Sequence, residues 1–360
     1  IYYGVNYISR NLIMCNRKNL LNGNAFILGV SGSGKSFMAK EELTFVALST
    51  DDDILVVDPE REYETLIKSL GGEVIRFSPN SKNHINALDM SKEYGDGDNP
   101  ITLKSSFVMS LYENLNNGKI DGAANSIVDR CVKFVYQEYI KNYEGEPPTL
   151  RDLRRELLEQ EEPLAKQIAL SLELFTEGTL DVFSHQTNVD MQNRILCFDV
   201  LDLGKQLKSI GMLIMLDTIL NRVMENRKKG KRTWVYIDEI YLFFANEYSS
   251  SFLSESWKRF RKYGALATDI TQNVSDCLLS PTARTMFSNS EFLVHLNQAS
   301  TDRLDLANLF HISNTQMGYI QDTGAGQGLL KIRNSLVPFI NEFPKNTKLY
   351  NLMTTKPEDM

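Results

Sequence analysis

The sequence has little cysteine, histidine or tryptophan, with four, four and two residues among 360. The four cysteines lie far apart and form no C-x-x-C pair, and the four histidines show no metal-ligand spacing. These shortages argue against a zinc site and against a disulfide scaffold. We therefore expect the cysteines to be reduced thiols, as is usual for a protein that works inside a cell.

Long apolar runs and excess positive charge are also missing. No run approaches the roughly 20 residues of a membrane-spanning helix, and no signal peptide is recognisable. The net charge is −7, whereas a protein that grips duplex DNA along one face is usually basic. A short basic cluster at 228–232 is interpreted as a solvated loop. The charge does not indicate a nucleic-acid partner, although it leaves open DNA threading through the pore of an oligomer.

The most informative motif is GVSGSGKS at residues 29–36, a complete G-x-x-x-x-G-K-[ST] phosphate-binding loop, or Walker A motif. It follows the apolar run 25–28 and precedes a predicted helix, which is the strand–loop–helix context that the motif needs. Lys35 is expected to reach the β- and γ-phosphates and the Ser36 hydroxyl to hold Mg²⁺, while backbone N–H groups surround the phosphates. The predicted nucleotide-binding residues here are Gly29, Ser31, Gly32, Ser33, Gly34, Lys35, Ser36 and Phe37.

A second element has the pattern of a Walker B motif. The apolar run 233–237 is predicted to be a buried strand, and it ends in Asp238 and Glu239. Asp238 is expected to hold Mg²⁺ through water and Glu239 to act as the general base on an attacking water molecule. A GTPase or a small-molecule kinase does not usually need that second carboxylate. The pair therefore favours an ATPase with ATP and Mg²⁺ as its cofactors.

A third strand is predicted at 265–273, with a polar tip at Gln272. An uncharged side chain there can sense the γ-phosphate by hydrogen bonding, and ligands of open α/β sheets bind at the carboxyl ends of the strands. The alternative is an ordinary polar residue at a helix N-terminus.

The segment Asp58-Pro59-Glu60 also follows a predicted strand, at 54–57. Glu60 could lie near the γ-phosphate as a second acid, or Asp58 and Pro59 could simply shape a turn. The sequence favours neither interpretation.

The order of predicted elements indicates an α/β fold interrupted by helices. Strands are expected at 25–28, 54–57, 73–77, 194–200, 233–237, 265–273 and 291–296, then paired strands near 328–333 and 335–341. Helices are expected at 209–228, around 254–262 and near 301–309 and 314–321, and helical patterns fill the region from 103 to about 188. We therefore expect residues 1–92 and 190–342 to form a discontinuous nucleotide-binding domain, 93–189 an all-helical insertion domain, and 343–360 a tail.

These motifs together resemble the C-terminal motor region of the VirB-four family, the large ATPase of bacterial type IV secretion and conjugation systems. The matching pieces are 4–6, 22–24, 29–37, 58–63, 237–239 and 271–276, and the resemblance extends from Gly4 to about Pro338. Asp269 departs from it, because the family usually has a small or apolar residue there.

The resemblance implies a RecA-like P-loop core, a mostly parallel sheet flanked by helices, with a helical insertion domain. It implies ATP hydrolysis that powers pilus biogenesis and substrate transfer, at the inner face of the bacterial cell membrane. The implied partners are other secretion-system components and further copies of the chain, as a hexamer when active, while this chain alone could be a monomer or dimer. Family members carry an additional N-terminal domain, and since the chain begins with Ile1 we expect it to be part of a longer protein.

Related motors complete their site with an arginine from a neighbouring subunit. In them this arginine lies on the helix that leads into the Gln strand, so the resemblance points first to Arg261, with Arg259 beside it and Arg333 as an alternative nucleotide contact. The competing interpretation is a basic helix end that complements its own dipole.

Three functions remain to be separated. The first is the secretion ATPase, and the second is a DNA-translocating motor such as a coupling protein or chromosome translocase, which shares the loop and the fold. The third is a scaffold that binds nucleotide without hydrolysing it, against which Glu239 beside Asp238 argues.

Overall fold

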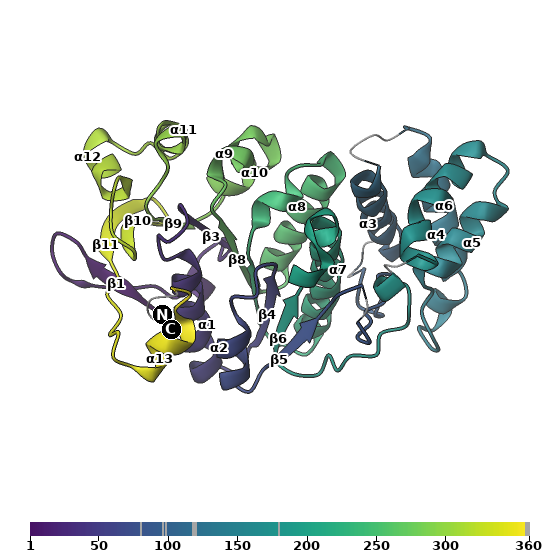
Figure 1. Ribbon diagram of the computed structural model, residues 1–360, viewed down its shortest axis with the longest axis horizontal. Coiled ribbons are helices and arrows are strands. Elements are labelled where there is room, and N and C mark those ends of the chain that lie inside the picture. The colour runs from purple at the N-terminus through teal and green to yellow at the C-terminus, as the bar shows by residue number, and fades with distance from the viewer. Residues whose placement is uncertain (80, 96, 98, 117–120, 179–180, 357–360) are drawn as a thin grey trace.

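The computed structural model describes residues 1–79, 81–95, 97, 99–116, 121–178 and 181–356, so the last four residues of the expected tail lie outside the described part. At its centre is an 11-stranded sheet (Figure 1). Its strands are β1 (Tyr2–Asn6), β2 (Leu12–Met14), β3 (Ala25–Leu28), β4 (Asp53–Asp58), β5 (Glu73–Arg76), β6 (Ile195–Asp199), β7 (Thr233–Ile237), β8 (Ala265–Thr271), β9 (Phe292–His295), β10 (Gln327–Ile332) and β11 (Ser335–Ile340).

The strand order is β2-β1-β11-β10-β9-β3-β8-β7-β4-β6-β5. From β9 to β5 neighbouring strands are parallel, whereas β10, β11, β1 and β2 extend the sheet with antiparallel pairs. Every residue of β3, β4, β6, β7 and β8 is buried, as expected for parallel strands with helices on both faces. The predicted α/β fold, a mostly parallel sheet flanked by helices, is confirmed.

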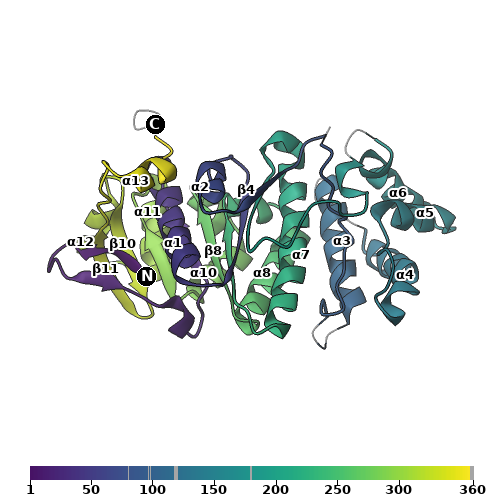
Figure 2. The same ribbon diagram turned by 90° about the horizontal axis from the view of Figure 1, so that it is seen from below.

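Helices cover both faces of this sheet. On one face α1, α2 and α13 pack together (Figures 1 and 2), over a core that includes Ile27, Val56 and Tyr236. On the other face α7 and α8 pack over Phe26, Val235 and Ala267. The helices are α1 (Lys35–Ser49), α2 (Glu64–Ser69), α3 (Pro100–Leu115), α4 (Ala124–Tyr136), α5 (Leu150–Glu159), α6 (Pro163–Thr176), α7 (Lys205–Lys228), α8 (Glu247–Lys262), α9 (Val274–Leu279), α10 (Pro281–Ser288), α11 (Ser300–Phe310), α12 (Asn314–Met317) and α13 (Lys348–Met353).

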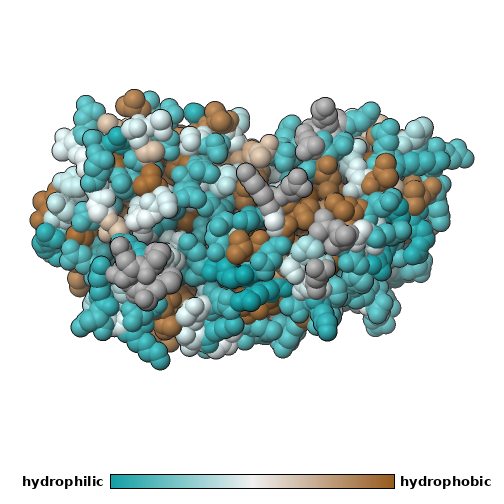
Figure 3. Space-filling model, viewed as in Figure 1, coloured by the Kyte–Doolittle hydropathy of each residue, from teal (hydrophilic) through white to brown (hydrophobic). Residues whose placement is uncertain are grey.

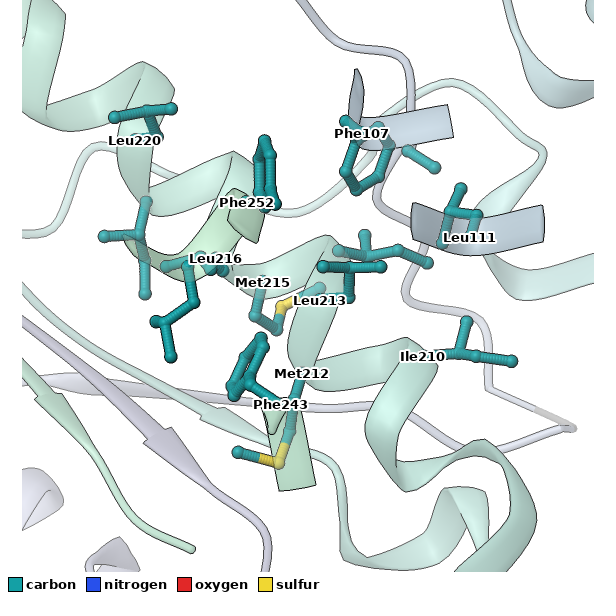
Figure 4. Packing of buried hydrophobic residues seen from close by; sticks show 14 of the residues in the cluster. Phe107, Leu111, Ile210, Met212, Leu213, Met215, Leu216, Leu220, Phe243 and Phe252 are labelled. Atoms are coloured by element: carbon teal, nitrogen blue, oxygen red, sulfur yellow. The ribbon is translucent and has the colours of Figure 1, made fainter. Parts of the chain in front are cut away.

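The helices α3 to α6 lie beyond α7 and α8, at the end of the molecule away from β1 and β2 (Figures 1 and 2). Apolar side chains join the two parts, and Phe107 of α3 lies against Phe252 of α8 with ring centroids 5.7 Å apart (Figure 4). A buried ion pair joins them too, between Lys104 of α3 and Asp217 of α7 at 2.5 Å, and the Tyr94 hydroxyl donates to the same carboxylate. Because each charge is buried with its partner, removing one alone would strongly destabilise this junction.

One observed helix is longer than predicted, and two short helices were not predicted at all. The helix expected around 254–262 begins earlier, at Glu247, because the Glu113 carboxylate of α3 accepts hydrogen bonds from the backbone N–H groups of residues 247 to 249. A carboxylate at a helix N-terminus satisfies N–H groups that have no partner within the helix. The helices α9 and α10 were not predicted.

Surface hydrophobicity is scattered in the view of Figure 3, where teal hydrophilic residues separate small brown groups. Within the described residues, no helix combines the length and the hydrophobicity that crossing a membrane requires.

Asp269, the departure from the family pattern, is a fully buried carboxylate on the central strand β8. Burial raises its pKa from 3.8 to about 8, against smaller opposing effects of Trp257 and Arg17. The folded protein therefore keeps a proton that the unfolded chain loses above about pH 4. It follows that this residue costs stability progressively as the pH rises towards 8, at roughly 1.4 kcal/mol per pH unit.

We expect Asp269→Asn to remove this cost, since the amide has the same shape and no proton to lose. In urea unfolding at pH 5, 6, 7 and 8, the stability gained over the parent protein should grow with pH and reach a few kcal/mol at pH 8. Asp51→Asn, which removes an exposed carboxylate, is the control. Parallel pH profiles for Asp269→Asn and the parent would contradict the assignment.

Candidate nucleotide-binding site

The phosphate-loop motif lies between the end of β3 and the start of α1, as its sequence context predicts. Gly32 and Gly34 have φ of +75° and +100°, in the left-handed region that favours glycine, and Gly34 caps α1. The Val30 N–H donates to the Asn297 carbonyl at 2.8 Å, and the Ser33 hydroxyl donates to the Val30 carbonyl at 2.7 Å. These bonds hold the loop in place and direct the N-terminus of α1 towards the pocket described below.

Asp238 and Glu239 follow β7 on the same edge of the sheet. The Asp238 N–H donates to the Val57 carbonyl of β4 at 3.2 Å, which continues the ladder by one residue. Glu239 then has φ of +52°, in the left-handed region, and its N–H donates to Asp238 Oδ1 at 2.9 Å. Such strained backbone in a non-glycine residue is often found at functional sites.

Gln272, just beyond β8, donates from Nε2 to Glu239 Oε1 at 2.8 Å. Among the described residues, the other oxygen, Glu239 Oε2, is buried and has no hydrogen-bond partner. Gln272 thus holds the Glu239 carboxylate in one orientation and leaves one oxygen able to accept a proton.

The pocket has an excess of carboxylates over cations. Burial, together with the charges of Glu62 and Glu239, raises the pKa of Asp238 to about 8. Burial also raises the pKa of Glu239, against the opposing effect of the Lys35 ammonium, and lowers the pKa of Lys35. Groups with perturbed pKa values are concentrated at functional sites.

A magnesium ion fits the donors here. Ser36 and Asp238 both line the pocket, and hydroxyl and carboxylate oxygens are the ligands that Mg²⁺ prefers. In the described part of the chain, no three His, Cys, Asp or Glu side chains are grouped as a metal site of their own.

The turn after β4 is shaped by Asp58, whose carboxylate accepts hydrogen bonds from the backbone N–H groups of Glu60, Glu62 and Tyr63. Glu60 lines the pocket but is exposed, and it pairs with Lys208 of α7 at 2.6 Å. Glu62 also lines the pocket, with one buried carboxylate oxygen that has no described partner. Sequence reasoning missed Glu62, although its position two residues after Glu60 was a usable signal.

The structure brings most predicted site residues into one pocket of about 800 Å³. Those that line it are Ser31, Gly32, Gly34, Lys35, Ser36, Phe37, Glu60, Asp238, Glu239 and Gln272. Gly29 and Ser33 belong to the loop but do not line the pocket. Sequence reasoning missed the rest of the lining, which comes from Met38 of α1, Glu62, residues 325–326 and 341–343, and the C-terminal residues up to Lys356.

Arg261 and Arg333 are not brought to this pocket. Arg261 is exposed at the C-terminal end of α8, before β8 begins, and Arg333 lies in the turn after β10, where its side chain donates to the Asn19 carbonyl at 3.2 Å. The strand register places both arginines near the amino end of β3, whereas the phosphate loop follows the carboxyl end of that strand. Neither arginine therefore lines the pocket of its own chain.

Solved structures of other proteins share this fold. VirB4 of Thermoanaerobacter pseudethanolicus aligns with a TM-score of 0.81 at 22% identity, over 96% of each chain. The plasmid coupling protein TrwB, in complex with the ATP analogue ADPNP, aligns with a TM-score of 0.59 at 16% identity, over 91% of this chain and 87% of its own. TrwB in complex with ADP and Mg²⁺ aligns with a TM-score of 0.57 at 15% identity, over the same shares.

The resemblance to VirB-four motors is thus confirmed at the level of the fold. A search of curated proteins gives no match. A model of the TraG P-loop domain matches residues 10–323. That match covers most of the sequence, so the chain belongs to the TraG P-loop domain family.

Proposed function

We propose that this chain is the ATPase motor of a type IV secretion or conjugation system, hydrolysing ATP to ADP and phosphate. One observation carries the proposal: the phosphate loop, Asp238 and Glu239 line one pocket, with Gln272 orienting Glu239. Family membership and the fold shared with VirB4 support the secretion role. In this proposal residues 1–92 and 190–342 form the motor domain and 93–189 a helical insertion.

The geometry of the pocket supports a role for each of these side chains. Backbone N–H groups of the loop and the N-terminus of α1 bind the phosphates, and Lys35 neutralises charge on the β- and γ-phosphates. A bound Mg²⁺ would offset phosphate charge, held by Ser36 and, through water, by Asp238. Glu239 Oε2 accepts the proton of the attacking water, and Gln272 links that carboxylate to the γ-phosphate position.

A scaffold that only binds nucleotide fits these features less well. Holding Glu239 in strained backbone, with a free carboxylate oxygen, costs stability that binding alone does not require. A DNA-translocating motor is the second candidate, because TrwB, a plasmid coupling protein, shares the fold. The lower TM-score of that alignment and the net charge of −7 favour the secretion motor.

Steady-state ATP hydrolysis, measured with and without single- and double-stranded DNA, tests the proposal. We expect Mg²⁺-dependent hydrolysis that DNA does not change. Stimulation of several-fold by DNA would favour the translocase. Tight ATP binding with no hydrolysis at any protein concentration would favour the scaffold.

We further propose that the chain assembles with itself, as a hexamer when active, at the inner face of the cell membrane with other secretion components, and that Arg261 acts in a neighbour's site. Specific activity should then rise with protein concentration. Arg261→Ala and Lys35→Ala subunits, each inactive alone, should recover part of the activity when mixed, since mixed interfaces can pair an intact loop with an intact arginine.

Lys258→Ala, which removes an exposed cation from the same end of α8, is the matched control and should stay active. Arg333→Ala tests the alternative arginine in the same mixing assay. The Arg261 assignment fails if turnover does not depend on concentration and mixing restores nothing.

A further inference from the structure

The pocket continues past the phosphate loop into a region made by the C-terminal part of the chain. Beyond Ser36 its lining comes from Phe37 of α1 and from residues after β11, among them Asn341, Phe343 and Tyr350. The family match ends at residue 323, so it assigns no role to this segment. The volume of about 800 Å³ is more than phosphates alone need and is in the range of pockets that hold whole small-molecule ligands.

Three aromatic rings gather in this region. The Phe37 ring lies 5.6 Å from the Phe343 ring and 5.4 Å from the Tyr350 ring, measured between centroids. Phe37 and Phe343 remain partly exposed although aromatic neighbours surround them. Aromatic faces at the open side of a nucleotide pocket bind planar bases by stacking.

Asn341 adds a directional polar group. Its Nδ2 donates to the Glu41 carboxylate of α1 at 2.5 Å, and since a carboxylate only accepts, this bond fixes which end of the amide faces Glu41. The other end, Oδ1, is buried and has no hydrogen-bond partner among the described residues. A buried acceptor without a donor is costly, so a ligand N–H group here would gain both a bond and relief of that cost.

We propose that the C-terminal segment 341–350, together with Phe37, forms the base subsite of the pocket and selects adenine. The base stacks on the aromatic cluster of Phe37, Phe343 and Tyr350. The side-chain oxygen of Asn341, Oδ1, accepts a hydrogen bond from the 6-amino group of adenine. Guanine has a carbonyl oxygen at that position, which would face Asn341 Oδ1 without a proton between them. The inference rests on the proposed function, because the proposed function places the nucleotide phosphates at the Walker A loop.

Binding measured by calorimetry with magnesium pyrophosphate, ADP and GDP separates the two subsites. The parent protein should bind ADP more tightly than either pyrophosphate or GDP. Phe343→Leu keeps an apolar side chain but loses the ring, so its Kd for ADP should rise about 10-fold while its Kd for pyrophosphate stays unchanged. Phe134→Leu, on an exposed ring of α4 away from the pocket, is the control and should change neither.

Asn341→Leu removes the acceptor and should reduce the preference for ADP over GDP by about 10-fold. This ratio remains informative if Phe343→Leu weakens pyrophosphate binding through a general loss of structure. An unchanged Kd for ADP in Phe343→Leu, or an unchanged preference in Asn341→Leu, overturns the base subsite while the proposed function stands. A parent protein that binds neither ADP nor pyrophosphate overturns the proposed function itself.

Discussion

Glu239→Gln is expected to bind ATP like the parent protein and to lose turnover by about 10²–10⁴-fold. The amide has the size of the carboxylate and can keep a hydrogen bond with Gln272, but it cannot take a proton from water. Because Glu239 Oε2 is buried without a described partner, the substitution breaks no hydrogen bond there. Filter binding of ATP and single-turnover hydrolysis measure the two effects separately.

Glu60→Gln is the matched control, since it also removes a pocket carboxylate, but one that is exposed and paired with Lys208. It should change turnover far less than Glu239→Gln. Near-normal turnover in Glu239→Gln together with a large loss in Glu60→Gln would move the general base to Glu60.

Lys35→Ala is expected to abolish hydrolysis and to weaken ATP binding by about 10- to 100-fold, the range that loss of a hydrogen bond to a charged group implies. Lys35 Nζ donates to the Val30 carbonyl at 3.0 Å. Burial lowers the pKa of this ammonium, which means that the fold does not benefit from its charge. The variant should therefore unfold at a temperature close to that of the parent.

Lys68→Ala, which removes an exposed cation from α2, serves as the control and should leave binding and hydrolysis intact. Equilibrium ATP binding, steady-state hydrolysis and thermal unfolding on the same samples complete the comparison. Hydrolysis at the parent rate in Lys35→Ala would show that the phosphate site lies elsewhere.

The parts of this molecule that could be predicted are those whose signal is local. The phosphate loop is set by glycines at fixed spacing, and the central strands are continuous apolar runs, so both were found at nearly their observed bounds. The α/β fold followed from the alternation of such runs with helical patterns. Asp238, Glu239 and Gln272 could be placed near the loop because the carboxyl ends of parallel strands meet at one edge.

What could not be predicted depends on contacts between distant segments. The start of α8 depends on Glu113, which lies on another helix and replaces a local cap. The C-terminal lining of the pocket requires α13 to pack on α1 and α2, which no short-range pattern encodes.

The helices α3 to α6 lie in the chain between two strands that pair with each other, and this has a consequence for how the chain folds. β5 and β6 are hydrogen-bonded neighbours, yet β5 ends at Arg76 and β6 begins at Ile195, with α3 to α6 between them. β1 likewise pairs with β11, from the other end of the chain. Pairings between such distant segments carry a large loop-closure entropy and slow the search for the native topology. Early formation of the α3–α6 helices, whose contacts are mostly local, would shorten the effective distance between β5 and β6, so we expect these helices to gain hydrogen-exchange protection before the sheet does.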